Sequence, residues 1–289
     1  MTGILLALVA MLGWGFADFF AQKAARKVGI STTLFFGSAF GALMLLPLAW
    51  SHLDLILVPR NAAILLLATA IGLFTALLSL EAFRRGKMAV IEPILGLELP
   101  ITIALAIALR GERVSLPEIL AFGAVFCGIL LAATSKPLGA RLRDGGRIER
   151  GVFLGLVGAV GLGASNFITG VASQDISPII AVWFGRALFS VIFAAYLLVK
   201  GRLVATLETS RAHAGLLFCV ASLYLVAFLA FAMATTKSPI SVVTTISQCY
   251  IVLTVLLGVR VNKEKLTRHQ TAGIAAAVVG ILVLAALSA

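Results

Sequence analysis

Ionisable side chains lie in the middle of stretches that are otherwise apolar. Asp18 occurs in LGWGFADFF, Glu98 in IEPILGLELP, and Arg186 within a third apolar run. A lone charge at the centre of a bilayer costs at least about 2.5–3.5 kcal/mol on insertion scales, so such residues usually line solute pathways or pair with one another. Their chemistry would be recognition of a charged solute: Glu98 could bind an amine or carry a proton, and Arg186 could bind a carboxylate or phosphate.

The composition identifies the elements that must position these side chains. Of the 289 residues, 61% are hydrophobic and only 12% are charged, whereas soluble domains carry roughly 25% charged residues. Apolar runs long enough to cross about 30 Å of hydrocarbon recur along the whole chain. Because the backbone must bond internally in lipid, these runs are expected to be helices, and the strict alternation typical of an outer-membrane barrel is absent. We predict an all-α membrane protein.

Ten apolar runs predict ten transmembrane helices joined by short loops, with no room for a soluble domain. The first run could be a signal peptide, but its basic cluster follows the apolar residues instead of preceding them, so we interpret it as a retained span. The predicted spans are 3–25, 31–50, 61–83, 87–109, 115–135, 150–172, 177–199, 212–235, 238–259 and 269–287.

The distribution of charge predicts the orientation of the chain. The net charge of +11 alone would be compatible with binding nucleic acid, but 18 basic residues fall in one set of alternate loops and four in the other. The positive-inside rule places the basic loops in the cytoplasm and both termini outside. We therefore expect a multi-pass protein of the plasma membrane and no nucleic-acid partner.

Cysteine and histidine residues give no indication of a metal or cofactor. Cys127, Cys219 and Cys249 lie in apolar spans, without metal or redox spacing, and are interpreted as small core residues. The three histidines fall in or beside loops. A glycine-rich phosphate-binding loop is absent, so the chain is not expected to hydrolyse ATP by itself. We predict no metal site and no cofactor.

The two halves of the chain resemble each other. Residues 3–20 align with 151–168, so that Asp18 meets Asn166, and residues 111–131 align with 263–283, so that Gly128 meets Gly280. Each half holds five spans, and an odd number makes the second half enter the membrane from the opposite side. Such inverted repeats are typical of alternating-access transporters with a solute site near the bilayer midplane. The predicted domains are 1–135 and 150–289, with 136–149 as a cytoplasmic linker.

Several short motifs accompany this repeat. Trp14-Gly15 lies in the first span, Glu98 and Pro100 in the fourth, and Gly111 to Arg113 with Ser115 open the fifth. In this order the chain resembles the EamA type of the drug/metabolite transporter superfamily. The resemblance implies a small-molecule transporter in which spans 1–4 rock against spans 6–9, with spans 5 and 10 peripheral. Many relatives keep their termini in the cytoplasm, whereas the charges here predict the reverse.

The candidate site combines these residues, and each retains a structural alternative. Asp18 shares a helix face with Trp14 and Gln22 and either lines a polar cavity or bonds to a neighbouring helix. Glu98 and Arg186 either bind solute or form a buried salt bridge between spans 4 and 7. The predicted solute-binding residues are Trp14, Asp18, Glu98, Asn166, Arg186, Gln248 and Tyr250; the proton-coupling candidates are Asp18 and Glu98; the predicted helix-breaking and gating residues are Pro93, Gly96 and Pro100.

The leading interpretation is a secondary transporter of a small polar or amphipathic metabolite, such as an amino acid, an amine or a drug-like solute. Proton coupling, uniport and exchange all fit, and direction and oligomeric state stay open, although a monomer would suffice. An intramembrane enzyme would need a clustered catalytic set, and the acids are scattered. A sensor or scaffold would need a partner surface, which short loops do not provide. We expect no enzymatic activity, and partners limited to the solute and membrane lipid.

Overall fold

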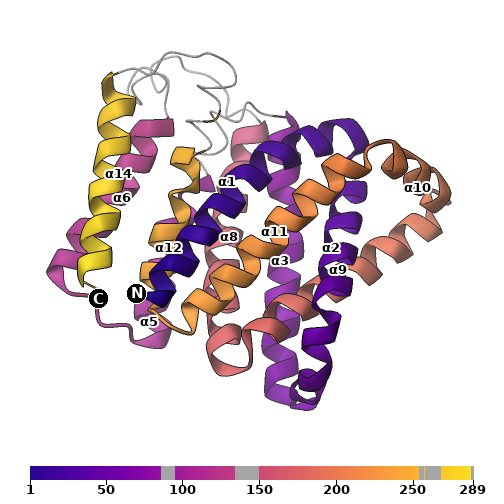
Figure 1. Cartoon of the computed structure of the whole chain (residues 1–289), viewed down its shortest axis with the longest axis horizontal. Helices are drawn as coiled ribbons and strands as arrows, with labels where there is room; N and C mark the ends of the chain where they lie inside the picture. Colours follow the sequence, from indigo (N-terminus) through magenta and orange to yellow (C-terminus); the bar gives the residue numbers. More distant parts are fainter. Residues whose placement is uncertain (86–94, 134–149, 254–256, 258–267, 288–289) are drawn as a thin grey trace.

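The chain forms a bundle of helices in a computed structural model (Figure 1). The structure describes residues 1–85, 95–133, 150–253, 257 and 268–287, and no strand occurs among them. The helices are α1 (Thr2–Val28), α2 (Ile30–Ala49), the 3-10 helix η1 (Trp50–Leu57), α3 (Pro59–Arg85), α5 (Glu98–Arg110), α6 (Leu116–Ala133), α8 (Arg150–Asp175), α9 (Pro178–Val199), α10 (Leu203–Ala212), α11 (Ala214–Thr235), α12 (Ile240–Gln248) and α14 (Arg268–Leu287).

Six helical segments in the described part are long and apolar enough to cross a membrane. They correspond to the predicted spans 1, 2, 3, 6, 7 and 8. The helices α5, α6, α12 and α14 lie within or over the other four predicted spans, parts of which fall outside the described residues. The all-helical fold is therefore confirmed, and the count of ten spans stays a prediction.

Two of the connections expected to be simple loops are helical. The η1 helix continues from α2 to Leu57, and α10 fills the connection between α9 and α11. The sequence of α10, LVATLETSRA, contains good helix formers, but ten residues span only about 15 Å, too short to cross the hydrocarbon core.

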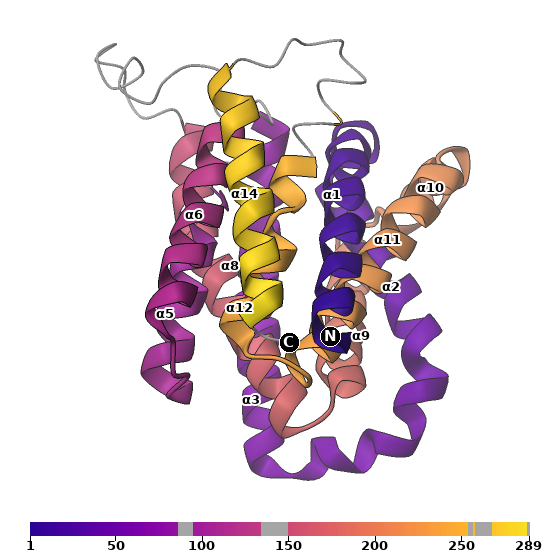
Figure 2. The same cartoon turned by 60° about the vertical axis from the view of Figure 1, so that its left-hand side comes forward.

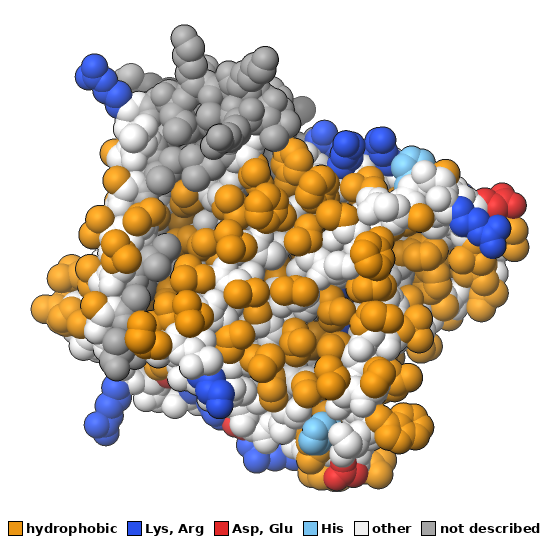
Figure 3. All heavy atoms as spheres, viewed as in Figure 1, with side chains coloured by type: hydrophobic (Ala, Val, Ile, Leu, Met, Phe, Trp, Pro, Cys, Tyr) orange, Lys and Arg blue, Asp and Glu red, His pale blue; other side chains and the backbone are white. Residues whose placement is uncertain are grey.

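The first helix illustrates how the bundle packs in a membrane. Its exposed face carries large apolar side chains and its buried face carries small ones. The exposed side chains are Leu5, Val9, Leu12 and Phe16, and the buried ones include Ala7, Ala10, Ala17, Ala21 and Ala24. Helices in lipid associate through close packing of small residues, because lipid tails are as apolar as leucine. Figure 3 shows one face of the molecule, on which hydrophobic side chains cover the middle of the described part and charged side chains lie toward its margins.

Helix packing repeats between the two halves of the chain. The contact of α1 with α11 is matched by that of α8 with α3, and the contact of α12 with α1 is matched by that of α5 with α8. Helices of equivalent spans also pack directly on each other: α2 on α9, α6 on α14, and α5 of the fourth predicted span on α12 of the ninth. This pattern of contacts is what two repeats related by a pseudo-two-fold axis would give.

The equivalent helices α1 and α8 run in opposite directions. Gly3, at the start of α1, packs against Ser238. Gln174, at the end of α8, donates a hydrogen bond to the Thr235 carbonyl oxygen at 2.9 Å. The start of α1 and the end of α8 are therefore at the same end of the bundle. The first residues of α1 and the last residues of α14 also lie at that end (Figures 1 and 2).

The α6–α14 pair stands at the edge of the bundle (Figure 1). Its two helices meet at Gly128 and Gly280, the pair that the repeat alignment matched. A Cβ atom at Gly128 would lie 2.6 Å from the Ala277 backbone nitrogen, and one at Gly280 would lie 2.5 Å from Val125 Cγ2. Only hydrogen fits at either position, so these glycines set the close approach of the two helices. The peripheral place of this pair agrees with what the family resemblance implied for spans 5 and 10.

Candidate functional site

A cavity of about 230 Å³ lies inside the bundle and is lined by both repeats. Its walls come from α1, α2, α3 and α5 of the first half and from α8, α9, α11 and α12 of the second, and no described residue of α6 or α14 takes part. The structure brings all seven predicted solute-binding residues to this cavity, although their spans are far apart in the sequence. They are Trp14, Asp18, Glu98, Asn166, Arg186, Gln248 and Tyr250.

Glu98 lies where the two repeats meet, and its side chain is 2% exposed. Each of its carboxylate oxygens accepts a hydrogen bond from an amide: Oε2 from Asn166 Nδ2 at 3.1 Å, and Oε1 from Gln248 Nε2. Glu98 is also the first residue of α5, where the positive end of the helix dipole favours an acidic side chain. A buried acid is therefore stabilised by two amides from the opposite repeat.

The helix that carries Glu98 is interrupted directly before it. Leu95 is helical, Gly96 and Leu97 form a turn, and α5 then begins. Pro100 is the third residue of α5, in the first turn, where a missing backbone N–H costs no intrahelical bond. The predicted interruption at Gly96 is present, whereas Pro93 lies outside the described residues. A role of Pro93, Gly96 and Pro100 in gating stays a prediction.

A second interruption lies beside the same site in the other repeat. The α12 helix ends at Gln248, and Cys249 forms a turn. No proline occurs at this depth of the second half, so the proline signal that predicted the first break could not predict this one. Glu98 and Gln248 therefore lie at the breaks in two equivalent predicted spans, Glu98 where α5 begins and Gln248 where α12 ends.

Asp18 fulfils both of the interpretations that the sequence left open. It lines the cavity, and it also accepts a hydrogen bond from the Tyr224 hydroxyl of α11 at Oδ1. Tyr224 is a cavity residue that sequence reasoning missed. Its signal was a single phenol in the otherwise apolar run of α11, and nothing in the sequence placed it opposite Asp18.

Arg186 forms no salt bridge with Glu98. No carboxylate of the described residues lies within 4.0 Å of its guanidinium, which instead lies over the Phe228 ring with 4.6 Å between Cζ and the ring centroid. Its side-chain stem packs at Gly41 of α2. The salt-bridge alternative is therefore wrong, because the two oxygens of Glu98 already accept from amides while Arg186 is held on an aromatic face.

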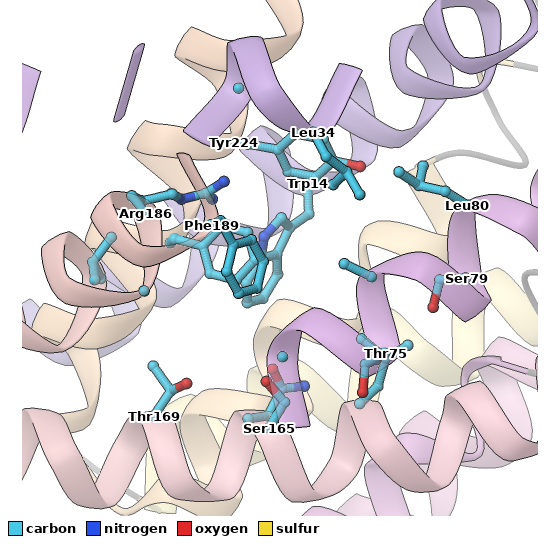
Figure 4. Close-up of a pocket in the computed structure, with 18 of the residues that line it drawn as sticks. Trp14, Leu34, Thr75, Ser79, Leu80, Ser165, Thr169, Arg186, Phe189 and Tyr224 are labelled. Atoms are coloured by element: carbon cyan, nitrogen blue, oxygen red, sulfur yellow. The ribbon is translucent and has the colours of Figure 1, made fainter. Parts of the chain in front are cut away.

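Aromatic side chains form one wall of the cavity. The Trp14 ring lies 5.4 Å from Phe228 and 6.2 Å from Tyr250, centroid to centroid, in edge-to-face arrangements. Figure 4 shows Trp14 and Phe189 in the middle of the view, with Arg186 to one side. Such a wall is suited to the apolar part of a solute, and next to a guanidinium it also suits a planar group.

Hydroxyl side chains of α3 and α8 form another wall, which sequence reasoning did not identify. Thr75 and Ser79 of α3 and Ser165 and Thr169 of α8 all line the cavity and are labelled in Figure 4. The Thr75 and Ser79 hydroxyls are buried and have no partner among the described residues. The available signal was small polar residues repeating every three or four positions in apolar spans, a pattern that also occurs in simple helix packing.

The cysteines differ from their predicted core role. Cys249 is buried as expected, but Cys219 is half-buried and Cys127 is exposed on α6. Cys127 faces outward because α6 packs through Gly128 and Val125 on α14, which leaves its neighbour on another face. Among the described residues, no group of three His, Cys, Asp or Glu side chains could hold a metal ion.

Comparisons with known proteins agree with this architecture. A solved crystal structure of another protein superposes with a TM-score of 0.69 at 15% identity, covering 100% of this chain and 97% of that chain. That likeness shows the fold alone. A search of curated proteins finds no match. The model of the EamA-like transporter family matches residues 1–134 and again residues 149–286. Because these two matches cover most of the chain, the protein belongs to the EamA-like transporter family.

Proposed function

We propose that the protein is a secondary transporter that moves a small polar or amphipathic solute, such as an amino acid, an amine or a drug-like molecule, across the plasma membrane. Family membership makes it a membrane transporter of the drug/metabolite transporter superfamily. The solute class, the ten spans and the mechanism belong to the proposal. We propose no enzymatic activity and no cofactor.

The observation that carries the proposal is the composition of the central cavity. Both repeats line it, and it collects Asp18, Glu98 and Arg186 from three different helices. Its volume of about 230 Å³ lies just below the roughly 300–1,000 Å³ of sites for drug-sized ligands, which favours a small metabolite. Acids, one guanidinium, hydroxyls and aromatic rings together suit a solute with both charged and apolar parts.

The arrangement of the repeats supports alternating access as the proposed mechanism. In our proposal the first four spans rock against the equivalent spans of the second half, while the α6–α14 pair stays at the edge. The interruptions before Glu98 and after Gln248 would let the ends of both helices move at the solute. Asp18 and Glu98 are the candidate proton carriers; uniport and exchange remain alternatives that the same cavity could serve.

We also propose that both termini face away from the cytoplasm. The sequence distributes 18 basic residues over one set of loops and four over the other, and the loops with few basic residues are on the side of the termini. The proposal requires only one copy of the chain, because a single chain supplies every wall of the cavity.

The test is solute binding followed by transport. The thermal stability of the detergent-purified protein would be measured across a metabolite library at two pH values, and hits would be tested for uptake into proteoliposomes. A solute present at about 100 times its Kd contributes about 2.7 kcal/mol. We expect a hit that is lost in Glu98→Gln or Arg186→Ala.

Matched variants separate a site effect from a charge effect. Glu208→Gln on α10 and Arg113→Ala after α5 change the same residue types at exposed positions outside the cavity, and both should keep the hit. Hits that survive both cavity variants would show that the charged residues are structural. A folded protein that binds no solute and transports none would favour a sensor or scaffold.

A further inference from the structure

The orientation of two cavity amides is determined by Glu98. Asn166 on α8 and Gln248 on α12 each present the amide nitrogen to one of its oxygens. A carboxylate accepts hydrogen bonds and donates none. Turning either amide over would place a carbonyl oxygen against a carboxylate oxygen. Glu98 therefore directs the carbonyl oxygens of both amides away from itself.

This orientation leaves an acceptor without a donor. Gln248 is 1% exposed, and its Oε1 atom is buried and accepts no hydrogen bond within the described part of the chain. A buried acceptor of this kind is costly and calls for a partner that the protein itself does not supply. Gln248 and Asn166 both line the central cavity, so a bound solute is the natural source of the missing donor.

The charges around the amides specify the type of donor. Glu98 lies between the two amides, and Asp18 lines the same cavity. Arg186 is held over Phe228 and forms no ion pair with either acid among the described residues. The two acids therefore lack a cationic partner in the described structure. A cation that also donates hydrogen bonds would satisfy the free carbonyl and would also offset the charge of the acids when they are ionised, whereas a neutral hydroxyl would do only the first.

We propose that the carbonyl oxygens of Asn166 and Gln248 accept hydrogen bonds from a protonated primary amine of the solute, with Glu98 as the residue that positions both amides. The inference rests on the proposed function and names the part of the solute that this site binds. A sodium ion fits less well, because hard cations need several oxygen ligands and the oxygens of Glu98 already accept from amides.

Two probes that share a ring and a positive charge test the inference. Benzylamine is protonated at neutral pH and donates hydrogen bonds, whereas benzyltrimethylammonium carries the charge but donates none. Binding to the purified full chain would be measured by titration calorimetry at constant ionic strength. We expect benzylamine to bind about ten- to hundred-fold more tightly, the range for hydrogen bonds to a charged group.

The decisive variant is Gln248→Met, which keeps the length of the side chain and removes the carbonyl. We expect it to reduce the preference for benzylamine to less than about three-fold. Gln22→Met is the matched control on α1, at a position that does not line the cavity, and should keep the full preference. If Gln248→Met does not fold, Asn166→Ala removes the other carbonyl and should have the same effect.

Four results would overturn the inference: equal affinity for the two probes, a preference that survives both variants, no binding of either probe, or competition by sodium chloride beyond that of choline chloride. Failure of the proposed function gives a different result. If benzylamine binds as expected but no solute is transported, the amine site stands and the transport proposal fails. If another solute is transported and benzylamine does not bind, only this inference fails.

Discussion

Glu98 and Gln248 are separated by 150 residues and are hydrogen-bonded to each other. That separation lies between the two offsets, 148 and 152, that align the halves of the sequence, so the two residues occupy equivalent places in the two repeats. The contact between α5 and α12 brings them together. One repeat supplies an acid and the other an amide, so the cavity is chemically asymmetric although its scaffold is nearly symmetric.

Removing the acid should destabilise the protein more than neutralising it. In Glu98→Ala two buried amide donors lose their acceptor, and each such loss costs about 1–3 kcal/mol. Glu98→Gln keeps one acceptor oxygen and should cost less. Thermal unfolding in detergent would compare them, with Glu208→Ala on the exposed α10 as control. Equal effects of the two Glu98 variants would contradict the observed pair of hydrogen bonds.

Removing the cavity guanidinium should have little effect on stability. Arg186→Met leaves no described acid without its partner, and replacing a half-buried charge of a membrane helix with an apolar side chain is often neutral or stabilising. The loss of the stacking on Phe228 costs about 0.5–2 kcal/mol and opposes that gain. Solutes that carry a carboxylate or phosphate should bind at least ten-fold more weakly. Destabilisation by 3–5 kcal/mol would instead indicate a broken buried ion pair.

The hydroxyl of Tyr224 should stabilise the protein through its hydrogen bond to Asp18. Tyr224→Phe removes a hydrogen bond to this acid and leaves it without that donor, a loss of about 1.5–3 kcal/mol for a bond to a charged group. Tyr196→Phe removes a hydroxyl from a side chain that is 45% exposed on α9 and should change stability by less than about 0.5 kcal/mol. Chemical or thermal unfolding would measure the stability of both variants. Similar losses would show that the Tyr224 hydroxyl stabilises the protein no more than an exposed hydroxyl does.

Adding a methyl group should have opposite effects on stability at two glycines of α6, because their surroundings differ. Gly128→Ala places a Cβ atom 2.6 Å from the Ala277 backbone nitrogen and should cost about 1–3 kcal/mol. Gly123→Ala meets nothing within 4 Å and should stabilise the helix by up to about 1 kcal/mol. The midpoint of thermal unfolding in detergent should fall for Gly128→Ala and rise for Gly123→Ala. Because the α6–α14 pair contributes no described residue to the cavity, folded Gly128→Ala protein should still transport.

The two ion pairs at Asp175, the last residue of α8, should contribute unequally to the stability of the protein. Arg110 reaches both oxygens of Asp175, at 2.9 and 3.1 Å, and also Gln174 at 2.8 Å. Arg60 approaches Asp175 only at 3.4 Å, with its side chain 76% exposed. We expect Arg110→Ala to cost about 1 kcal/mol and Arg60→Ala less than about 0.5 kcal/mol. Double-mutant cycles with Asp175→Asn would measure each coupling, and a larger coupling for Arg60 would contradict this order.

The sequence by itself determined the class of the protein, the repeat and the residues worth testing. Apolar runs long enough to span lipid, without the strict alternation of a barrel, predict helices, and the alignment of Asp18 with Asn166 and of Gly128 with Gly280 revealed the two halves. Charge within such runs is costly enough to single out Asp18, Glu98 and Arg186 without any coordinates.

Only the tertiary structure decided which of these residues touch. Depth along a span can be counted from the sequence, but the rotation of each helix about its axis depends on close packing of small residues, which many registers satisfy about equally well. For that reason the sequence could not decide between the two alternatives for Glu98 and Arg186. The structure shows that the salt-bridge alternative is wrong and that Asn166 and Gln248 are the partners of Glu98. Tyr224 and the hydroxyls of α3 were missed for a related reason. Whether a polar residue of an apolar helix faces the cavity or another helix is known only when the neighbouring helices are in place.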